Sequence, residues 1–168
     1  MIISLTGFMG SGKSSVGAAL SALLNFRFID LDDYVQKREG QSIAQMFSRG
    51  QEYFREAESR CLREILAEED QDTVLALGGG TVAYGQNLPA VLSLTRCVYL
   101  QASIDVIKRR LSSSATLRPL YDPETVEELY KSRLKYYAQA EFTIDTDNLT
   151  PAHTANLIAE LVTGKHTD

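Results

Sequence analysis

The sequence contains little of what marks membrane-spanning or nucleic-acid-binding proteins. No apolar run approaches the roughly 20 residues that a membrane-spanning helix requires. Residues 1–7 are apolar but show neither a basic leader nor a cleavage-site pattern, so we expect them to belong to the fold. The 17 Lys and Arg are outnumbered by 22 Asp and Glu, and the net charge of −5 comes with no basic block. We therefore expect no membrane or nucleic-acid partner, and we expect individually placed Arg and Lys side chains to hold any acidic substrate.

Cysteine and histidine are scarce as well. Cys61 and Cys97 lie far apart with no CxxC spacing, which predicts reduced thiols in a cytoplasmic protein. His153 and His166 lie near the C-terminus without a third ligand, so we interpret both as ordinary surface histidines rather than metal ligands or catalytic groups.

The length and composition are those of an ordinary globular protein. The chain has 168 residues, of which 44% are hydrophobic and 23% charged. A domain of this size buries roughly two-thirds of its unfolded surface, so it needs neither disulfides nor a structural metal. We expect residues 1–168 to form a single domain, and a monomer because no exposed apolar stripe is evident.

Short apolar runs alternate with helical patterns along the chain. The runs predict buried strands at 2–6, 26–29, 73–77, 97–100 and 141–144. Helical patterns follow Lys13 and cover 53–69, 104–111 and 123–138, and a last helix is opened by Thr150 as N-cap with Pro151 at the first helical position. The alternation predicts an α/β fold in three layers, with a five-stranded parallel sheet covered by helices on both faces.

Residues 7–14, GFMGSGKS, fit the phosphate-binding pattern G-x-x-x-x-G-K-[ST], directly after an apolar strand and at the start of a helix. The glycines let successive backbone N–H groups turn inward as an anion nest, and the helix N-terminus adds its positive dipole end. Lys13 is a charge that can reach the β- and γ-phosphates, and the Ser14 hydroxyl is the expected Mg²⁺ ligand. The fold is thus predicted to be of the P-loop NTP-hydrolase type, with Mg²⁺ and ATP bound by Gly10, Ser11, Gly12, Lys13, Ser14 and Ser15.

Three acidic residues follow the second predicted strand: Asp30, Asp32 and Asp33. Residues two apart on a strand share a face, and the carboxyl end of a parallel strand faces the ligand crevice, so Asp30 and Asp32 are predicted to point together toward the γ-phosphate. We assign Asp30 to the Mg²⁺ shell and Asp32 to the acceptor hydroxyl, while Asp33 is predicted to cap the helix that follows. Helix capping is the alternative interpretation for all three.

Together the segments GFMGSGKS, FIDLDDY, EYFREAE, LALGGGT and RPL, in this order between Gly7 and about Asp145, resemble the shikimate kinase family. The resemblance implies that Asp30 is associated with Mg²⁺ and that Asp32 binds the shikimate hydroxyls and acts as catalytic base. It implies a substrate site made of Asp32, Arg55, Gly78, Gly79, Gly80 and Arg133, in which the two arginines grip the carboxylate. The glycines follow a buried strand where other P-loop enzymes end in an acidic residue, and their bare backbone suits a ligand that rests on N–H groups.

The nucleotide side is implied in the same way. Arg110 corresponds to the arginine that lies against adenine, with Arg109 as the alternative, and Pro151 is also assigned to the nucleotide site. Arg118 corresponds to the arginine of a mobile lid at about 112–124, a segment rich in serine here. The family usually carries Pro-Leu-Tyr shortly after its second substrate arginine, whereas this chain has Leu-Lys-Tyr-Tyr after Arg133.

The predicted function is ATP-dependent phosphorylation of the 3-hydroxyl of shikimate, in the biosynthesis of aromatic amino acids. Lys13, Arg118 and Asp32 are the predicted catalytic residues. The alternatives are another small-metabolite P-loop kinase, of the gluconate or nucleoside monophosphate type, and an ATP-binding regulatory module. The arginines with the glycine loop favour a polyhydroxy carboxylate as acceptor.

Overall fold

The computed structural model describes residues 1–68, 70–113 and 120–164. Within these residues, five strands, all parallel, form one sheet in the order β2-β3-β1-β4-β5, which confirms the predicted α/β architecture. They are β1 (Ile2–Thr6), β2 (Arg27–Asp30), β3 (Thr73–Ala76), β4 (Arg96–Gln101) and β5 (Phe142–Asp145). The helices are α1 (Lys13–Leu24), α2 (Leu31–Glu39), α3 (Ile43–Ser48), α4 (Gln51–Leu66), the 3₁₀ turn η1 (Thr81–Ala83), α5 (Asn87–Leu94), α6 (Ile104–Ser112), α7 (Val126–Tyr137) and α8 (Pro151–Thr163).

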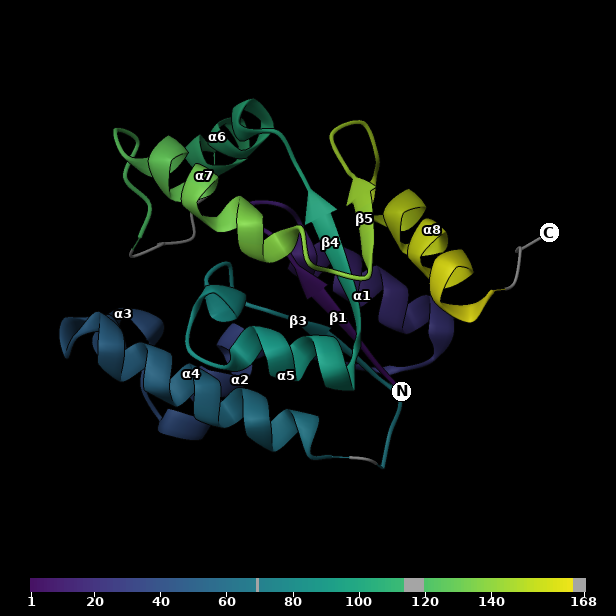
Figure 1. The fold of residues 1–168 in the computed structure, drawn as a ribbon, viewed down its shortest axis with the longest axis horizontal. Coiled ribbons are helices and arrows are strands. Elements are labelled where there is room, and N and C mark those ends of the chain that lie inside the picture. The colour runs from purple at the N-terminus through teal and green to yellow at the C-terminus, as the bar shows by residue number, and fades with distance from the viewer. Residues whose placement is uncertain (69, 114–119, 165–168) are drawn as a thin grey trace.

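Helices cover both faces of the sheet (Figure 1). On β4, Val98 and Leu100 pack into a core with α1 and α8, whereas Cys97 and Tyr99 pack into a second core with residues of α4, α5 and α7. This alternation is what a strand buried on both faces requires, and it accounts for the continuous apolar runs in the sequence.

The predicted helix boundaries need small corrections. α4 begins at Gln51 and ends at Leu66, rather than spanning 53–69, and α7 begins at Val126, three residues after the predicted start. The short helices α3 and α5 were not predicted, and both have fewer than nine residues, too few for a clear helical period. Thr150 caps α8 and Pro151 occupies its first turn, as predicted.

The sheet order brings three chain segments to one edge. In the paired register, Ala76 of β3 lies between Leu5 of β1 and Asp30 of β2, so the residues that follow these strands leave the sheet side by side. This edge of a parallel sheet is where α/β proteins bind ligands.

The structure also shows where the cysteines and one of the two histidines lie. Cys61 and Cys97 are both buried and unpaired, as expected for reduced thiols. His153 is exposed on the first turn of α8, and His166 lies outside the described residues. Among the helices that the structure describes, none has the length and apolarity needed to cross a bilayer.

Candidate active site

The loop between β1 and α1 forms a phosphate cradle. Gly10 (φ 80°) and Gly12 (φ 93°) adopt left-handed backbone conformations that other residues rarely take, and α1 begins directly afterwards at Lys13. The Lys13 ammonium donates to the carbonyls of Gly7 (2.8 Å) and Phe8 (2.9 Å), so its charge lies against the loop. A cavity of about 260 Å³ opens here, lined among others by Gly10, Gly12, Lys13, Ser14 and Ser15. Ser11 is buried within the loop and is not part of that lining.

Asp30 joins this loop to the start of α2. One carboxylate oxygen accepts from the Ser14 hydroxyl at 2.5 Å, and the other accepts from the backbone N–H groups of Asp32 (3.1 Å) and Asp33 (3.4 Å). Asp30 is therefore the N-cap of α2, and the prediction that Asp33 caps this helix was wrong, because the helix already begins at Leu31 and Asp33 lies in its first turn.

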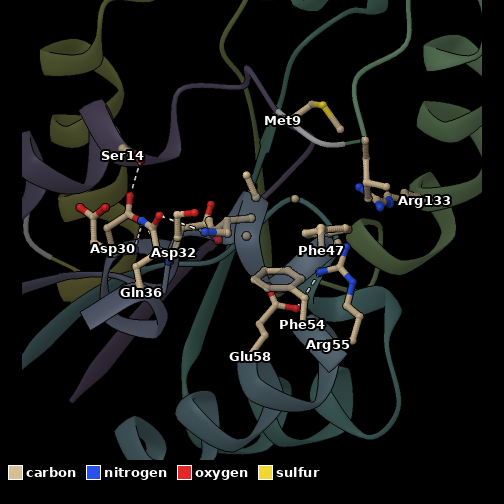
Figure 2. Close-up of a pocket in the computed structure, with 18 residues that line it drawn as sticks. Met9, Ser14, Asp30, Asp32, Gln36, Phe47, Phe54, Arg55, Glu58 and Arg133 are labelled. Carbon is tan, nitrogen blue, oxygen red and sulfur yellow. Dashed lines mark hydrogen bonds and ion pairs between the residues drawn. The ribbon is translucent and has the colours of Figure 1, made fainter. Parts of the chain in front are cut away.

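The pair of Ser14 and Asp30 suits a magnesium ion. Mg²⁺ prefers oxygen ligands and keeps several waters, so it is bound through one or two protein groups together with substrate phosphates. A hydroxyl and a carboxylate that meet beside the phosphate cradle are such groups (Figure 2). Within the described residues there is no cluster of three or more His, Cys, Asp and Glu side chains that would form an all-protein metal cage.

Asp32 lies on the first turn of α2, rather than on the strand with Asp30. It nevertheless lines both the phosphate cavity and a second cavity of about 740 Å³, as does Asp30. A Cβ atom built on Gly78 would lie 3.1 Å from an Asp32 carboxylate oxygen, so this acid faces the glycine loop. Its position between the two cavities is suited to a group that contacts both a nucleotide and an acceptor.

Each glycine of the loop after β3 leaves room for a different neighbour. A Cβ on Gly78 would lie 2.7 Å from a Glu58 carboxylate oxygen, and one on Gly79 would lie 3.0 Å from the backbone nitrogen of Met9 in the P-loop. A Cβ on Gly80 would lie 2.2 Å from Arg55 and 2.8 Å from Arg133. A side chain at any of the three glycine positions would therefore crowd a neighbouring residue of the P-loop or of the larger cavity.

Two buried arginines form the far wall of the larger cavity, opposite Asp30 and Asp32 (Figure 2). Arg55 on α4 and Arg133 on α7 are each only 6% exposed. Arg55 pairs at 2.7 Å with Glu58, which is fully buried and also accepts a 2.7 Å hydrogen bond from Thr81. These three charged side chains therefore carry a net charge of +1 inside the protein.

The charge on Arg133 is held at an electrostatic cost. Burial is the largest influence and lowers the pKa of Arg133, and the neighbouring Arg55 lowers it further, against the opposing effect of Tyr137. An anionic group bound between the two guanidinium groups would relieve this cost, and a carboxylate matches their planar geometry. The aromatic rings of Phe47 and Phe54, whose centroids are 4.7 Å apart, line the same cavity.

The other residues that were predicted to bind the nucleotide lie in different places. The Arg110 guanidinium donates to the Gly10 carbonyl at 3.0 Å and lines the phosphate cavity, whereas Arg109 is exposed and does not line it. Pro151, at the start of α8, is not among the residues that line either cavity. Arg118 and the middle of the predicted lid, residues 114–119, lie outside the described residues.

Sequence reasoning missed two residues that organise this site. Glu58 had a visible signal, because it follows Arg55 by three residues and such a pair shares one face of a helix. Tyr137 follows Arg133 by four residues on one helix face, but its hydrogen bond to the Gly79 carbonyl had no signal, since that partner lies 58 residues away.

Comparisons with known proteins agree with this geometry. A sequence model of the shikimate kinase family matches residues 9–163. The chain is 37% identical over 161 residues to a shikimate kinase of Thermodesulfovibrio yellowstonii (93% of this chain, 91% of that protein). It is 39% identical over 153 residues to one of Caldanaerobacter subterraneus (88% of each).

Solved structures give the same result. Shikimate kinase from Acinetobacter baumannii in complex with shikimate superposes with a TM-score of 0.90 at 29% identity, covering 99% of this chain and 95% of that one. Shikimate kinase from Aquifex aeolicus superposes with a TM-score of 0.82 at 34% identity, covering 98% and 97%. The matched segment contains nearly the whole P-loop, the glycine loop and both buried arginines, and the chain therefore belongs to the shikimate kinase family.

Proposed function

We propose that this protein transfers the γ-phosphoryl group of ATP to the 3-hydroxyl of shikimate, yielding shikimate 3-phosphate and ADP for aromatic amino-acid biosynthesis. The observation that carries the proposal is the convergence of Arg55 and Arg133 on Gly80, in a cavity that adjoins a P-loop. Membership of the family and the structural likeness to an enzyme in complex with shikimate support it.

The two cavities divide the work between acceptor and nucleotide. The arginine pair holds the carboxylate of the acceptor, which directs the hydroxyl-bearing side of the ring toward Asp32 and the P-loop. The P-loop amides and Lys13 hold the nucleotide phosphates, and Arg110 packs from the side of α6. From the family resemblance we assign Arg118 the role of closing over the phosphates.

Phosphoryl transfer passes through a loose transition state, so the side chains mainly position the reactants and balance charge. Asp32 accepts a hydrogen bond from the attacking hydroxyl and takes its proton late, as the new oxygen–phosphorus bond forms and the bond from the γ-phosphorus to the bridging oxygen of ADP breaks. Ser14 and Asp30 would hold Mg²⁺, which when bound neutralises charge on the β- and γ-phosphates.

The test is acceptor-dependent release of ADP from Mg-ATP, measured with shikimate, with gluconate, with AMP and with no acceptor. We expect release only with shikimate, with phosphate recovered on its 3-hydroxyl. Turnover with gluconate or AMP but not with shikimate would overturn the assigned acceptor while retaining a P-loop kinase. Acceptor-independent hydrolysis would instead favour an ATP-binding regulatory module.

A further inference from the structure

Tyr137 lies behind the glycine loop, at the end of α7. It is fully buried, and its ring stacks on that of Tyr99 with centroids 5.1 Å apart. Its hydroxyl donates a hydrogen bond to the Gly79 carbonyl. Among the described residues that line the larger cavity are Gly79, Gly80 and Arg133, but not Tyr137 itself. Tyr137 therefore contacts the wall of the acceptor site from outside the cavity.

Arg133 lies one helical turn earlier on α7, and its buried guanidinium is electrostatically coupled to the same hydroxyl. Tyr137 donates its one hydroxyl proton to the Gly79 carbonyl, and a guanidinium can only donate, so any contact between the two side chains is made through the hydroxyl oxygen. Burial raises the pKa of Tyr137, so the hydroxyl keeps its proton at neutral pH and can donate to Gly79.

The Tyr137 hydroxyl acts on two groups that line the larger cavity, the Gly79–Gly80 peptide and the Arg133 side chain. A peptide bond is planar and trans, so the N–H of Gly80 points opposite to the Gly79 carbonyl and hence away from Tyr137. One hydroxyl thus sets the direction of the Gly80 N–H and is electrostatically coupled to the Arg133 guanidinium, which lies beside Gly80.

We propose that Tyr137 is a positioning residue for the acceptor carboxylate. By holding the Gly79–Gly80 peptide in a fixed arrangement beside the Arg133 guanidinium, it lets both groups bind the same anionic group. This inference rests on the proposed function, since it takes shikimate as the acceptor. Tyr137 does not touch the substrate in this account and acts only through Gly80 and Arg133.

The test is the Tyr137→Phe variant, which keeps the buried ring and removes only the hydroxyl. Steady-state rates are measured against shikimate and against ATP, with Tyr136→Phe as a control that removes the hydroxyl of the neighbouring tyrosine. We expect the KM for shikimate to rise about tenfold in Tyr137→Phe, the size expected for one lost buried hydrogen bond. The KM for ATP and kcat should remain within about twofold of the wild type, and Tyr136→Phe should match the wild type.

A second acceptor separates positioning from general support of the fold. Shikimate methyl ester lacks the anionic carboxylate, so Tyr137→Phe and the wild type should use it with the same KM. An unchanged KM for shikimate in Tyr137→Phe, or an equal loss with shikimate and with the ester, would overturn the inference. A wild-type protein that fails to phosphorylate shikimate would overturn the proposed function first, and this inference with it.

Discussion

A Cβ atom on Gly80 would lie 2.2 Å from Nη2 of Arg55, so the arginine occupies the space that any side chain at position 80 would need. The backbone of Gly80 (φ −109°, ψ 2°) is accessible to other residues, so glycine is not required there by the turn. It is required because a guanidinium group must reach the wall of the cavity. The glycine at position 80 is thus explained by the binding site rather than by the turn.

Gly80→Ala should damage the acceptor site more than the fold. The added methyl group would push the ends of Arg55 and Arg133 out of their positions, and we expect the KM for shikimate to rise at least tenfold, roughly the value of one charged hydrogen bond. Steady-state kinetics and thermal unfolding measure the two effects.

Gly85→Ala is the matched control for Gly80→Ala, because its Cβ would meet nothing within 4 Å but its φ is +52°. The cost there is backbone strain, so we expect a loss of about 1 kcal/mol in unfolding free energy and an unchanged KM. The interpretation of Gly80 would be wrong if Gly80→Ala lost stability and kept its KM.

Glu58→Gln removes the buried partner of Arg55. Breaking a buried ion pair leaves one charge uncompensated, so we expect the unfolding free energy to fall by about 3 kcal/mol. Urea unfolding measures this change. The control is Glu64→Gln, which breaks the more exposed pair with Arg38 and should have a much smaller effect. Equal losses in the two variants would contradict the special role of the buried pair.

The sheet could be predicted from the sequence because its signal is local and physical. Strands buried on both faces read as continuous apolar runs, and β1, β3 and β4 each show one. The P-loop could be predicted for the same reason, since its glycines, lysine and serine are adjacent in the chain. The helix α3 also had a usable signal that was overlooked: Ser42 and Gln45 form a capping box.

The features of the site that could not be predicted depend on contacts between segments far apart in the sequence. Asp30 and Asp33 are equally good capping residues by type, and only the tertiary position of Ser14 shows why Asp30 occupies the cap. The convergence of Arg55 and Arg133 required α4 and α7 to be placed in space, and composition alone carries no such information. The family resemblance supplied these residues, whereas their geometry comes from the fold.

The buried thiols should make the protein less stable in alkali. Burial raises the pKa of Cys61 from 9.0 to about 11, so above pH 9 the thiol ionises first in the unfolded chain. Its contribution to stability is fully present below pH 9 and is lost as the pH rises through about 11. Urea unfolding at several pH values should show a shallower decline for Cys61→Ala than for the wild type. A thiol reagent at pH 8 should label neither cysteine until the protein unfolds.

Arg109 and Arg110 should respond differently to mutation. Arg110 contacts the Gly10 carbonyl and lines the phosphate cavity, whereas Arg109 is exposed. Arg110→Ala should raise the KM for ATP about tenfold, roughly the effect of losing one charged hydrogen bond, with a smaller effect on the KM for shikimate. Arg109→Ala is the matched control and should leave both constants unchanged. The reverse pattern would assign the nucleotide contact to Arg109.

Asp32→Asn should separate binding from chemistry. Asp32 lies between the two cavities, where a carboxylate can accept the proton of the attacking hydroxyl and an amide cannot. We expect kcat to fall by about 10²–10⁴-fold, the usual contribution of a general base, while ATP binding measured by calorimetry is retained. Asp33→Asn removes the same charge from the next residue of α2 and should leave kcat within a few-fold. If instead both variants lose activity to the same extent, the effect is one of charge near the phosphates, and proton transfer must be assigned to another group.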